Sequence, residues 1–217
     1  MKDRFDLLIF DWDGTLVDSI DWIVHCVQTA AKKCDCAIPS AQAAKDIIGL
    51  SIQEAMNTLF PNVDAAIQKQ MISHYSELFF SKQTTASDLF SGVEEMLVEL
   101  KQQGYQLAVA TGKTRSGLDK VLHGTGIGDF FCITRCADET ASKPHPLMLE
   151  QIMQHTGISP ERTLMIGDSV HDLQMAQNAQ ISSIGVTCGA HSAEILQQYQ
   201  PLFCIEQTTD LLELITG

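Results

Sequence analysis

FDLLIFDWDGT, residues 5–15, joins a short apolar run to two closely spaced aspartates. The run at 5–10 is typical of a strand that is buried on both faces of a parallel sheet. Asp11 and Asp13 follow it two residues apart, and in extended chain this spacing projects both side chains to the same side. Ligands of open α/β sheets bind beyond the carboxyl ends of the strands. The stretch therefore predicts a central strand that ends in a binding site.

Similar apolar runs recur along the chain and alternate with helical patterns. Strands are predicted at 105–110, 130–134 and 163–166, and weaker ones at 182–186 and 202–205. Amphipathic or helix-forming segments at 93–103, 147–155, 172–179, 193–198 and 210–215 separate or follow them. This alternation predicts an α/β fold, with a Rossmann-like three-layer α/β/α core around a mostly parallel sheet.

Residues 17–88 interrupt the alternation, because they contain no convincing strand. Helical patterns occupy 20–34, 41–48, 52–59 and 65–80, and Pro39, Gly49 and Pro61 separate them. We therefore expect an all-helical cap at 17–88, inserted into a catalytic core that consists of 1–16 and 89–217.

Composition narrows the classes of function. The chain has 217 residues and a formal net charge of −13, with 14 Lys+Arg against 27 Asp+Glu. This acidic balance argues against nucleic acid and against an anionic membrane surface as partners. The seven scattered cysteines are interpreted as reduced thiols of a cytoplasmic protein. We expect a small-molecule partner, and a monomer or a homodimer.

Polar residues also follow the other predicted strands. Thr111 ends the second strand, Asp168 follows the fourth, Asp172 lies four residues later, and a loop supplies Lys143. Clustered carboxylates with open positions suit Mg²⁺, while a hydroxyl and an amine suit a phosphoryl group. Each residue alone has an ordinary interpretation as a turn, a helix cap or a surface charge. Their joint occurrence at one sheet edge favours a phosphoryl-transfer site.

The chain resembles the haloacid dehalogenase-like hydrolases, and in particular the phosphoglycolate phosphatase-like branch with a small helical cap. Asp11-Trp12-Asp13-Gly14-Thr15-Leu16-Val17-Asp18-Ser19 is similar to the first motif of that family. Thr111-Gly112-Lys113 is similar to the second motif, Lys143-Pro144 to the third and Gly167-Asp168-Ser169-Val170-His171-Asp172 to the fourth. Gly189-Ala190-His191 also has a counterpart in that branch.

This resemblance implies a phosphatase that acts on a small phosphorylated metabolite, with phosphoglycolate as the default. Asp11 is the implied nucleophile, which forms an aspartyl-phosphate, and Asp13 is the implied acid and base. Implied ligands of Mg²⁺ are Asp11, the main-chain carbonyl of Asp13, and Asp168. The transferring phosphoryl group is held by Thr111 and Lys143, with further contacts from Gly112 and Lys113, and Asp172 orients Lys143 or a metal-bound water.

Single positions separate the branches of the family. Asp13 disfavours dehalogenation and phosphonate cleavage, because those relatives lack the second aspartate. Sugar-phosphate mutases similar to β-phosphoglucomutase stay an alternative, although they resemble Gly-x-Ser-Arg where this chain has Gly49-Leu50-Ser51-Ile52. Residues 17–88 contain no arginine to grip a second phosphate. A non-catalytic binding protein is the other alternative. His171 is interpreted as an exposed residue at a helix start.

Overall fold

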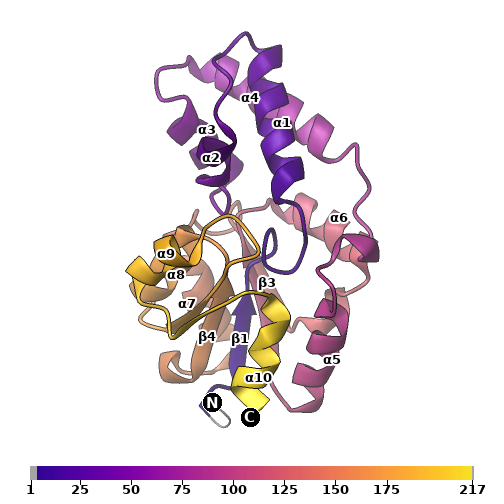
Figure 1. Ribbon diagram of the computed structural model, residues 1–217, viewed down its shortest axis with the longest axis vertical. Helices are drawn as coiled ribbons and strands as arrows, with labels where there is room; N and C mark the ends of the chain where they lie inside the picture. The colour runs from indigo at the N-terminus through magenta and orange to yellow at the C-terminus, as the bar shows by residue number, and fades with distance from the viewer. Residues whose placement is uncertain (1–3, 217) are drawn as a thin grey trace.

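Six parallel strands form the sheet in the computed structural model, which describes residues 4–216 (Figure 1). The strand order is β3-β2-β1-β4-β5-β6. β1 (Leu7–Phe10) lies inside the sheet, between β2 and β4, and all of its residues are buried. The Rossmann-like parallel sheet is therefore confirmed. The other strands are β2 (Gln106–Thr111), β3 (Ile133–Cys136), β4 (Thr163–Gly167), β5 (Ser182–Val186) and β6 (Phe203–Ile205).

Helices cover both faces of the sheet and complete three layers. Leu8 and Phe10 of β1 belong to one apolar core, and Leu7 and Ile9 belong to the other, because successive side chains of a strand point to opposite faces. The helices on the first face are α5 (Val93–Gln102), α6 (Arg115–Thr125) and α10 (Leu211–Thr216). Those on the second face are α7 (Leu147–Thr156) and α8 (Val170–Asn178), and the short α9 (Ala193–Leu196) packs against β5 and α8.

Four helices between β1 and α5 form a separate bundle with a core of its own. We call residues 20–80 the four-helix unit; in Figure 1 it lies beyond the end of the sheet toward which the β1 arrow points. Ser40, Ser51 and Asp64 begin three of its helices, and each side chain accepts a hydrogen bond from the first turn. The four helices are α1 (Ile20–Lys33), α2 (Ala41–Lys45), α3 (Ile52–Leu59) and α4 (Ala65–Phe79).

Two elements differ from the sequence prediction. β3 lies at Ile133–Cys136 rather than at 130–134, because Gly128–Phe130 forms a 3₁₀ turn before it. α6 was absent from the predicted helices, although Thr114 caps it by accepting a hydrogen bond from the Gly117 amide at 3.2 Å. Among the residues that the structure describes, no helix has the length and apolarity needed to cross a membrane.

Candidate active site

The pairing of β1 with its two neighbouring strands helps to bring three carboxylates together at the carboxyl edge of the sheet. Phe10 pairs with Val109 of β2 and with Ile166 of β4, so Asp11 emerges between the ends of these two neighbouring strands. Asp11, Asp168 and Asp172 are buried, and one oxygen atom of each lies within 4.8 Å of the others. Residues far apart in the sequence thus form one acidic cluster, which the strand-end argument predicts.

Lys143 supplies the positive charge inside this cluster. Its Nζ lies 2.6 Å from Asp11 Oδ1 and 2.6 Å from Asp172 Oδ1, and the lysine is itself buried. Burial disfavours the charged amine, but the two carboxylates outweigh burial and hold the pKa of Lys143 above its usual value. Lys143 is therefore a charged bridge between Asp11 and Asp172.

Both oxygens of Asp172 are occupied. Oδ1 accepts from Lys143, while Oδ2 accepts from the main-chain N–H of Ser169 at 3.1 Å and from its hydroxyl at 2.6 Å. Ser169 is the N-cap of α8 and Asp172 is the third residue of that helix, so the two side chains form a reciprocal capping box. The start of α8 thereby fixes the carboxylate that orients Lys143.

Asp168 is held by neutral donors alone. Thr15 Oγ1 donates to its Oδ1 at 3.1 Å, and the Ala190 amide donates to its Oδ2 at 2.7 Å. Burial, followed by the charges of Asp11 and Asp172, raises the pKa of Asp168 well above its usual value. Asp168 therefore has hydrogen-bond donors but no direct cationic partner among the residues from 4 to 216.

Asp11 carries the clearest sign of a missing ligand. Lys143 binds Oδ1, whereas the buried Oδ2 has no hydrogen-bond partner in the described part of the chain. Burial raises the pKa of Asp11 to about 7 despite the neighbouring lysine. A buried carboxylate oxygen without a partner is costly, and carboxylates are the donors that Mg²⁺ prefers. The residues present therefore fit a magnesium ion between Asp11 and Asp168.

Asp13 lies outside this buried cluster and faces the four-helix unit. Ser19 Oγ donates to its Oδ1 at 2.7 Å, and Lys113 Nζ lies 2.8 Å from its Oδ2. The Lys113 amine also lies 4.4 Å from the centre of the Phe79 ring of α4. The two aspartates of the first motif thus have different surroundings: Asp11 is enclosed by charges, whereas Asp13 borders a cavity between the core and the four-helix unit.

The loop after β2 packs directly on the four-helix unit. Thr111 is buried, and its Oγ1 accepts from the Lys113 amide at 3.3 Å. A Cβ atom at Gly112 would overlap the carbonyl oxygens of Gly49 and Leu50, so only glycine permits this approach. The positions predicted to contact phosphate, Thr111 to Lys113, therefore also form the junction between the two parts of the molecule.

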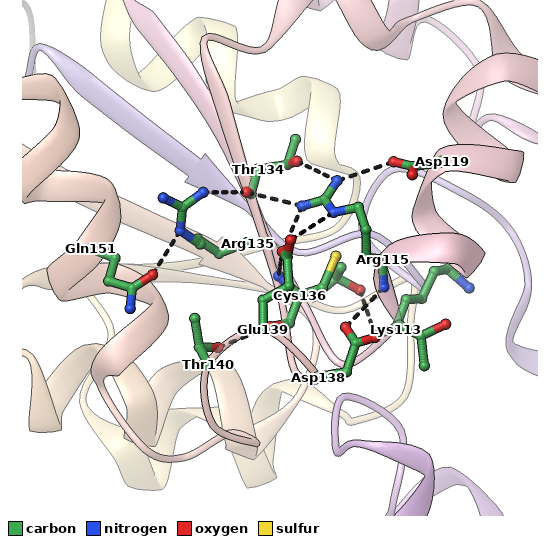
Figure 2. A network of polar contacts seen from close by, with 12 residues as sticks. Lys113, Arg115, Asp119, Thr134, Arg135, Cys136, Asp138, Glu139, Thr140 and Gln151 are labelled. Carbon is green, nitrogen blue, oxygen red and sulfur yellow. Dashed lines mark hydrogen bonds and ion pairs between the residues drawn. The ribbon is translucent and has the colours of Figure 1, made fainter.

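Figure 2 shows a polar network that joins the start of α6 to β3 and to the loop after β3. The Arg115 guanidinium donates to both carboxylate oxygens of Glu139, at 3.0 and 2.8 Å, and to the main-chain oxygen of Thr134 at 3.1 Å. The Ala137 amide also donates to the carbonyl of Lys113 at 3.1 Å. This network fixes the backbone that presents Lys113.

Two further contacts join the core to the four-helix unit. The Ser51 amide donates to Ser142 Oγ at 2.8 Å, next to Lys143. His171 Nε2 lies 2.8 Å from the carbonyl oxygen of Asp46. His171 lies in the first turn of α8, as the sequence predicts, but it is half-buried rather than exposed, because Asp46, the residue after α2, packs against it. Its contact is formed across the junction, and no local sequence signal indicates it.

Four residues around the carboxylates were not assigned a role from the sequence. Thr15 and Ser19 belong to the first motif, and Ser169 is recognisable as a helix N-cap followed by an acid three residues later. The Ala190 contact is made by a main-chain amide, so its side-chain type carries no signal. These residues hold Asp13, Asp168 and Asp172 in place.

Comparisons with known proteins agree with this arrangement. The family model described as haloacid dehalogenase-like hydrolase matches residues 8–186. The chain is 33% identical to probable phosphatase IndB of Dickeya dadantii (strain 3937), over 95% of this chain and 91% of that protein. It is 31% identical to pyrophosphatase PpaX of Bacillus velezensis, over 99% and 97%. The crystal structure of a predicted phosphoglycolate phosphatase from Haemophilus somnus 129pt superimposes with a TM-score of 0.84 at 25% identity, over 97% and 98%.

Proposed function

The chain belongs to the haloacid dehalogenase-like hydrolases and is a phosphatase, and we propose that it hydrolyses a small phosphate monoester through an aspartyl-phosphate on Asp11. The main observation that supports this proposal is that the two oxygens of the Asp11 carboxylate have different surroundings. Lys143 holds Oδ1 at 2.6 Å, and Oδ2 is buried without a partner in the described residues. A carboxylate held in one orientation can attack phosphorus through one oxygen, here Oδ1, while the partnerless Oδ2 is left for a cation.

Asp13 is the proposed acid and base. Its carboxyl group protonates the oxygen of the departing alcohol, and its carboxylate then removes a proton from the water that hydrolyses the aspartyl-phosphate. Ser19 and Lys113 fix the orientation of this side chain, at 2.7 and 2.8 Å. Its position beside the cavity places the departing group on the side of the four-helix unit.

Mg²⁺ is the proposed cofactor, held by Asp11, Asp168 and the main-chain carbonyl of Asp13. When bound, the ion neutralises charge on the phosphoryl oxygens and on the carboxylates. Thr111 and Lys143 are the proposed donors to the phosphoryl group, with Gly112 and Lys113 beside them, and Asp172 keeps Lys143 in position through the 2.6 Å contact. Location in the cytoplasm and a monomeric or dimeric state stay predictions from the sequence.

The test is release of inorganic phosphate from a panel of phosphate esters, with Mg²⁺ and with EDTA. We expect hydrolysis with Mg²⁺ only, and loss of at least a thousandfold in Asp11→Asn. The matched control is Asp21→Asn, since the Asp21 side chain is 99% exposed. Absence of release from every ester, or full activity of Asp11→Asn, would refute the proposal. Faster isomerisation of a hexose 1-phosphate than release of phosphate would favour the mutase alternative.

A further inference from the structure

The four-helix unit and the core enclose a cavity whose chemistry indicates the substrate. We propose that the preferred substrate is the phosphate monoester of a small apolar alcohol, an inference that rests on the phosphatase function proposed above. The carbon chain of this alcohol enters the cavity, while its phosphate lies at Asp11. The cavity has a volume of about 100 Å³ and is bordered by Asp13, so it lies next to the proposed departing oxygen.

Aliphatic side chains from the four-helix unit form one part of the cavity wall. Ile23 and Val27 come from α1, Ile48 and Leu50 from the segment after α2, and Ala55 from α3. Ile23, Val27, Ile48 and Ala55 are at most 6% exposed, so the wall is a fixed part of the bundle core. Such a surface binds carbon chains by removing apolar area from water.

Aromatic side chains of α4 and of Phe80, the residue that follows it, form another part of the wall. Tyr75 and Phe79 stack with ring centres 5.6 Å apart, and Phe80 meets Phe79 edge-on at 5.2 Å. Burial raises the pKa of the Tyr75 hydroxyl well above its usual value, so it stays neutral. Among the described residues, the lining that comes from the four-helix unit therefore contains no charged side chain.

Charge in the cavity is confined to the end nearest the core. Asp13 and Lys113 are the charged lining residues in the described chain, and they lie 2.8 Å apart. The Lys113 amine is therefore already paired, and it also lies over the Phe79 ring. A substrate with a carboxylate or a second phosphate would bury that charge against an apolar wall without a free cation, which is unfavourable. This disfavours phosphoglycolate, pyrophosphate and bisphosphates.

The volume limits the size of the alcohol. An apolar cavity of about 150 Å³ in another protein binds benzene, so about 100 Å³ accommodates a chain of roughly three to five carbon atoms. Each buried methylene favours binding by a factor of about four. We therefore expect kcat/KM to rise about fifteenfold from ethyl phosphate to butyl phosphate, and then to level off or fall.

The experiment measures kcat/KM with Mg²⁺ for acetyl, ethyl, butyl and octyl phosphate, 2-phosphoglycolate and pyrophosphate. Butyl phosphate is expected to exceed ethyl phosphate, octyl phosphate, 2-phosphoglycolate and pyrophosphate by at least tenfold each. Acetyl phosphate reports on the chemistry alone, because its acyl group is small and leaves easily. If acetyl phosphate is hydrolysed but the alkyl series is flat, or if 2-phosphoglycolate or pyrophosphate is preferred, the assignment of the cavity is wrong. If no compound releases phosphate, the proposed function fails and the assignment fails with it.

Two variants change the cavity, Ala55→Leu in its volume and Ile52→Arg in its charge, and Ala66→Leu is the control for the first. Ala55→Leu adds carbon atoms to the wall, and we expect the butyl-to-ethyl ratio of kcat/KM to fall at least fivefold. Ala66→Leu makes the same change at an exposed position of α4 and leaves that ratio within twofold. Ile52→Arg adds a cation to the lining at a partly exposed position.

Ile52→Arg is the variant that does not depend on filling a packed core. A charge-assisted contact strengthens binding by about tenfold or more, so the ratio of kcat/KM for 2-phosphoglycolate to that for butyl phosphate should rise at least tenfold. An unchanged ratio in both Ala55→Leu and Ile52→Arg would show that the alcohol does not enter the cavity.

Discussion

Replacement of Lys143 by methionine isolates the electrostatic role of the buried bridge. Met has a similar length without the charge, so the change leaves Asp11 and Asp172 buried and without their shared cation. Their side chains are 2% and 0% exposed, respectively, and each now lies 2.6 Å from the Lys143 amine. Removing one partner of a buried ion pair costs about 3–5 kcal/mol. We therefore expect Lys143→Met to lower the stability of the metal-free protein by this amount.

The assay is thermal unfolding in EDTA, because a bound cation would replace part of the lost charge. For a domain of 150–250 residues, 1 kcal/mol shifts Tm by about 2–4 °C, so the expected fall is about 6–20 °C. Lys82→Met is the matched control. Lys82 also lies 2.7 Å from a carboxylate, that of Asp88, but the two side chains are 50% and 17% exposed. Such a partly exposed pair contributes less than about 1 kcal/mol.

A double variant separates charge from packing. In Lys143→Met with Asp172→Asn, one of the unpaired carboxylates is gone, so the double variant should unfold at a higher temperature than Lys143→Met alone. If Lys143→Met lowers Tm by no more than Lys82→Met does, the bridge is not a charged pair in the folded protein. If the double variant is less stable than Lys143→Met, packing rather than charge controls the site.

Three other changes test the pKa of Asp11, the close packing at Gly112 and the role of Asp13. Burial raises the pKa of Asp11 to about 7, above its usual 3.8, so the folded protein binds this proton more tightly. Asp168, His171 and His191 also have shifted pKa values, so the quantity to measure is the free energy of unfolding of the wild type minus that of Asp11→Asn. In EDTA this difference should rise by about 1 kcal/mol from about pH 8.5 to about pH 6, as measured by urea unfolding. Gly112→Ala forces a Cβ against the four-helix unit and should cost about 1–3 kcal/mol and at least tenfold in kcat/KM, whereas Gly128→Ala, with its nearest neighbour 3.8 Å away, should change little. Asp13→Asn removes the proposed acid and base and should slow phosphate release by about a hundredfold to ten-thousandfold in steady-state assays.

The sequence predicts the centre of the sheet and the carboxylates better than the periphery. β1, β2 and β4 are buried, so their apolar runs are unmistakable, and the polar residues that follow them lie at one edge by topology alone. β3 is an edge strand with Thr134 and Arg135 half-exposed, so an apolar run does not define it. The strongest signal in that region is the preceding aromatic pair, which shifts the predicted strand toward the amino end.

Contacts across the junction could not be predicted, because they depend on how the four-helix unit packs against the core. Ser51 with Ser142 and His171 with Asp46 are separated by 91 and 125 positions, respectively. The sequence pattern does not predict α6, for a related reason. Its Gly117 and Gly124 weaken the helical pattern. Gly124 is required because a Cβ there would overlap the carbonyl oxygen of Thr84, and a Cβ at Gly117 would lie in tight contact with the Phe80 ring. Long-range packing, rather than local preference, selects these residues.

Charge at the site explains how an acidic protein can act on a phosphate ester. Asp11, Asp168 and Asp172 are buried around one lysine, so this cluster is negative whenever its three carboxylates are ionised. Lys113 does not offset it, because Asp13 already holds its amine at 2.8 Å. A phosphate dianion would therefore be repelled unless positive charge came from outside the chain. Three features agree with that requirement: the uncommitted oxygen of Asp11, the raised pKa of Asp11 and the raised pKa of Asp168. The same balance makes the proposed magnesium ion a condition for binding phosphate, in addition to any role in the reaction.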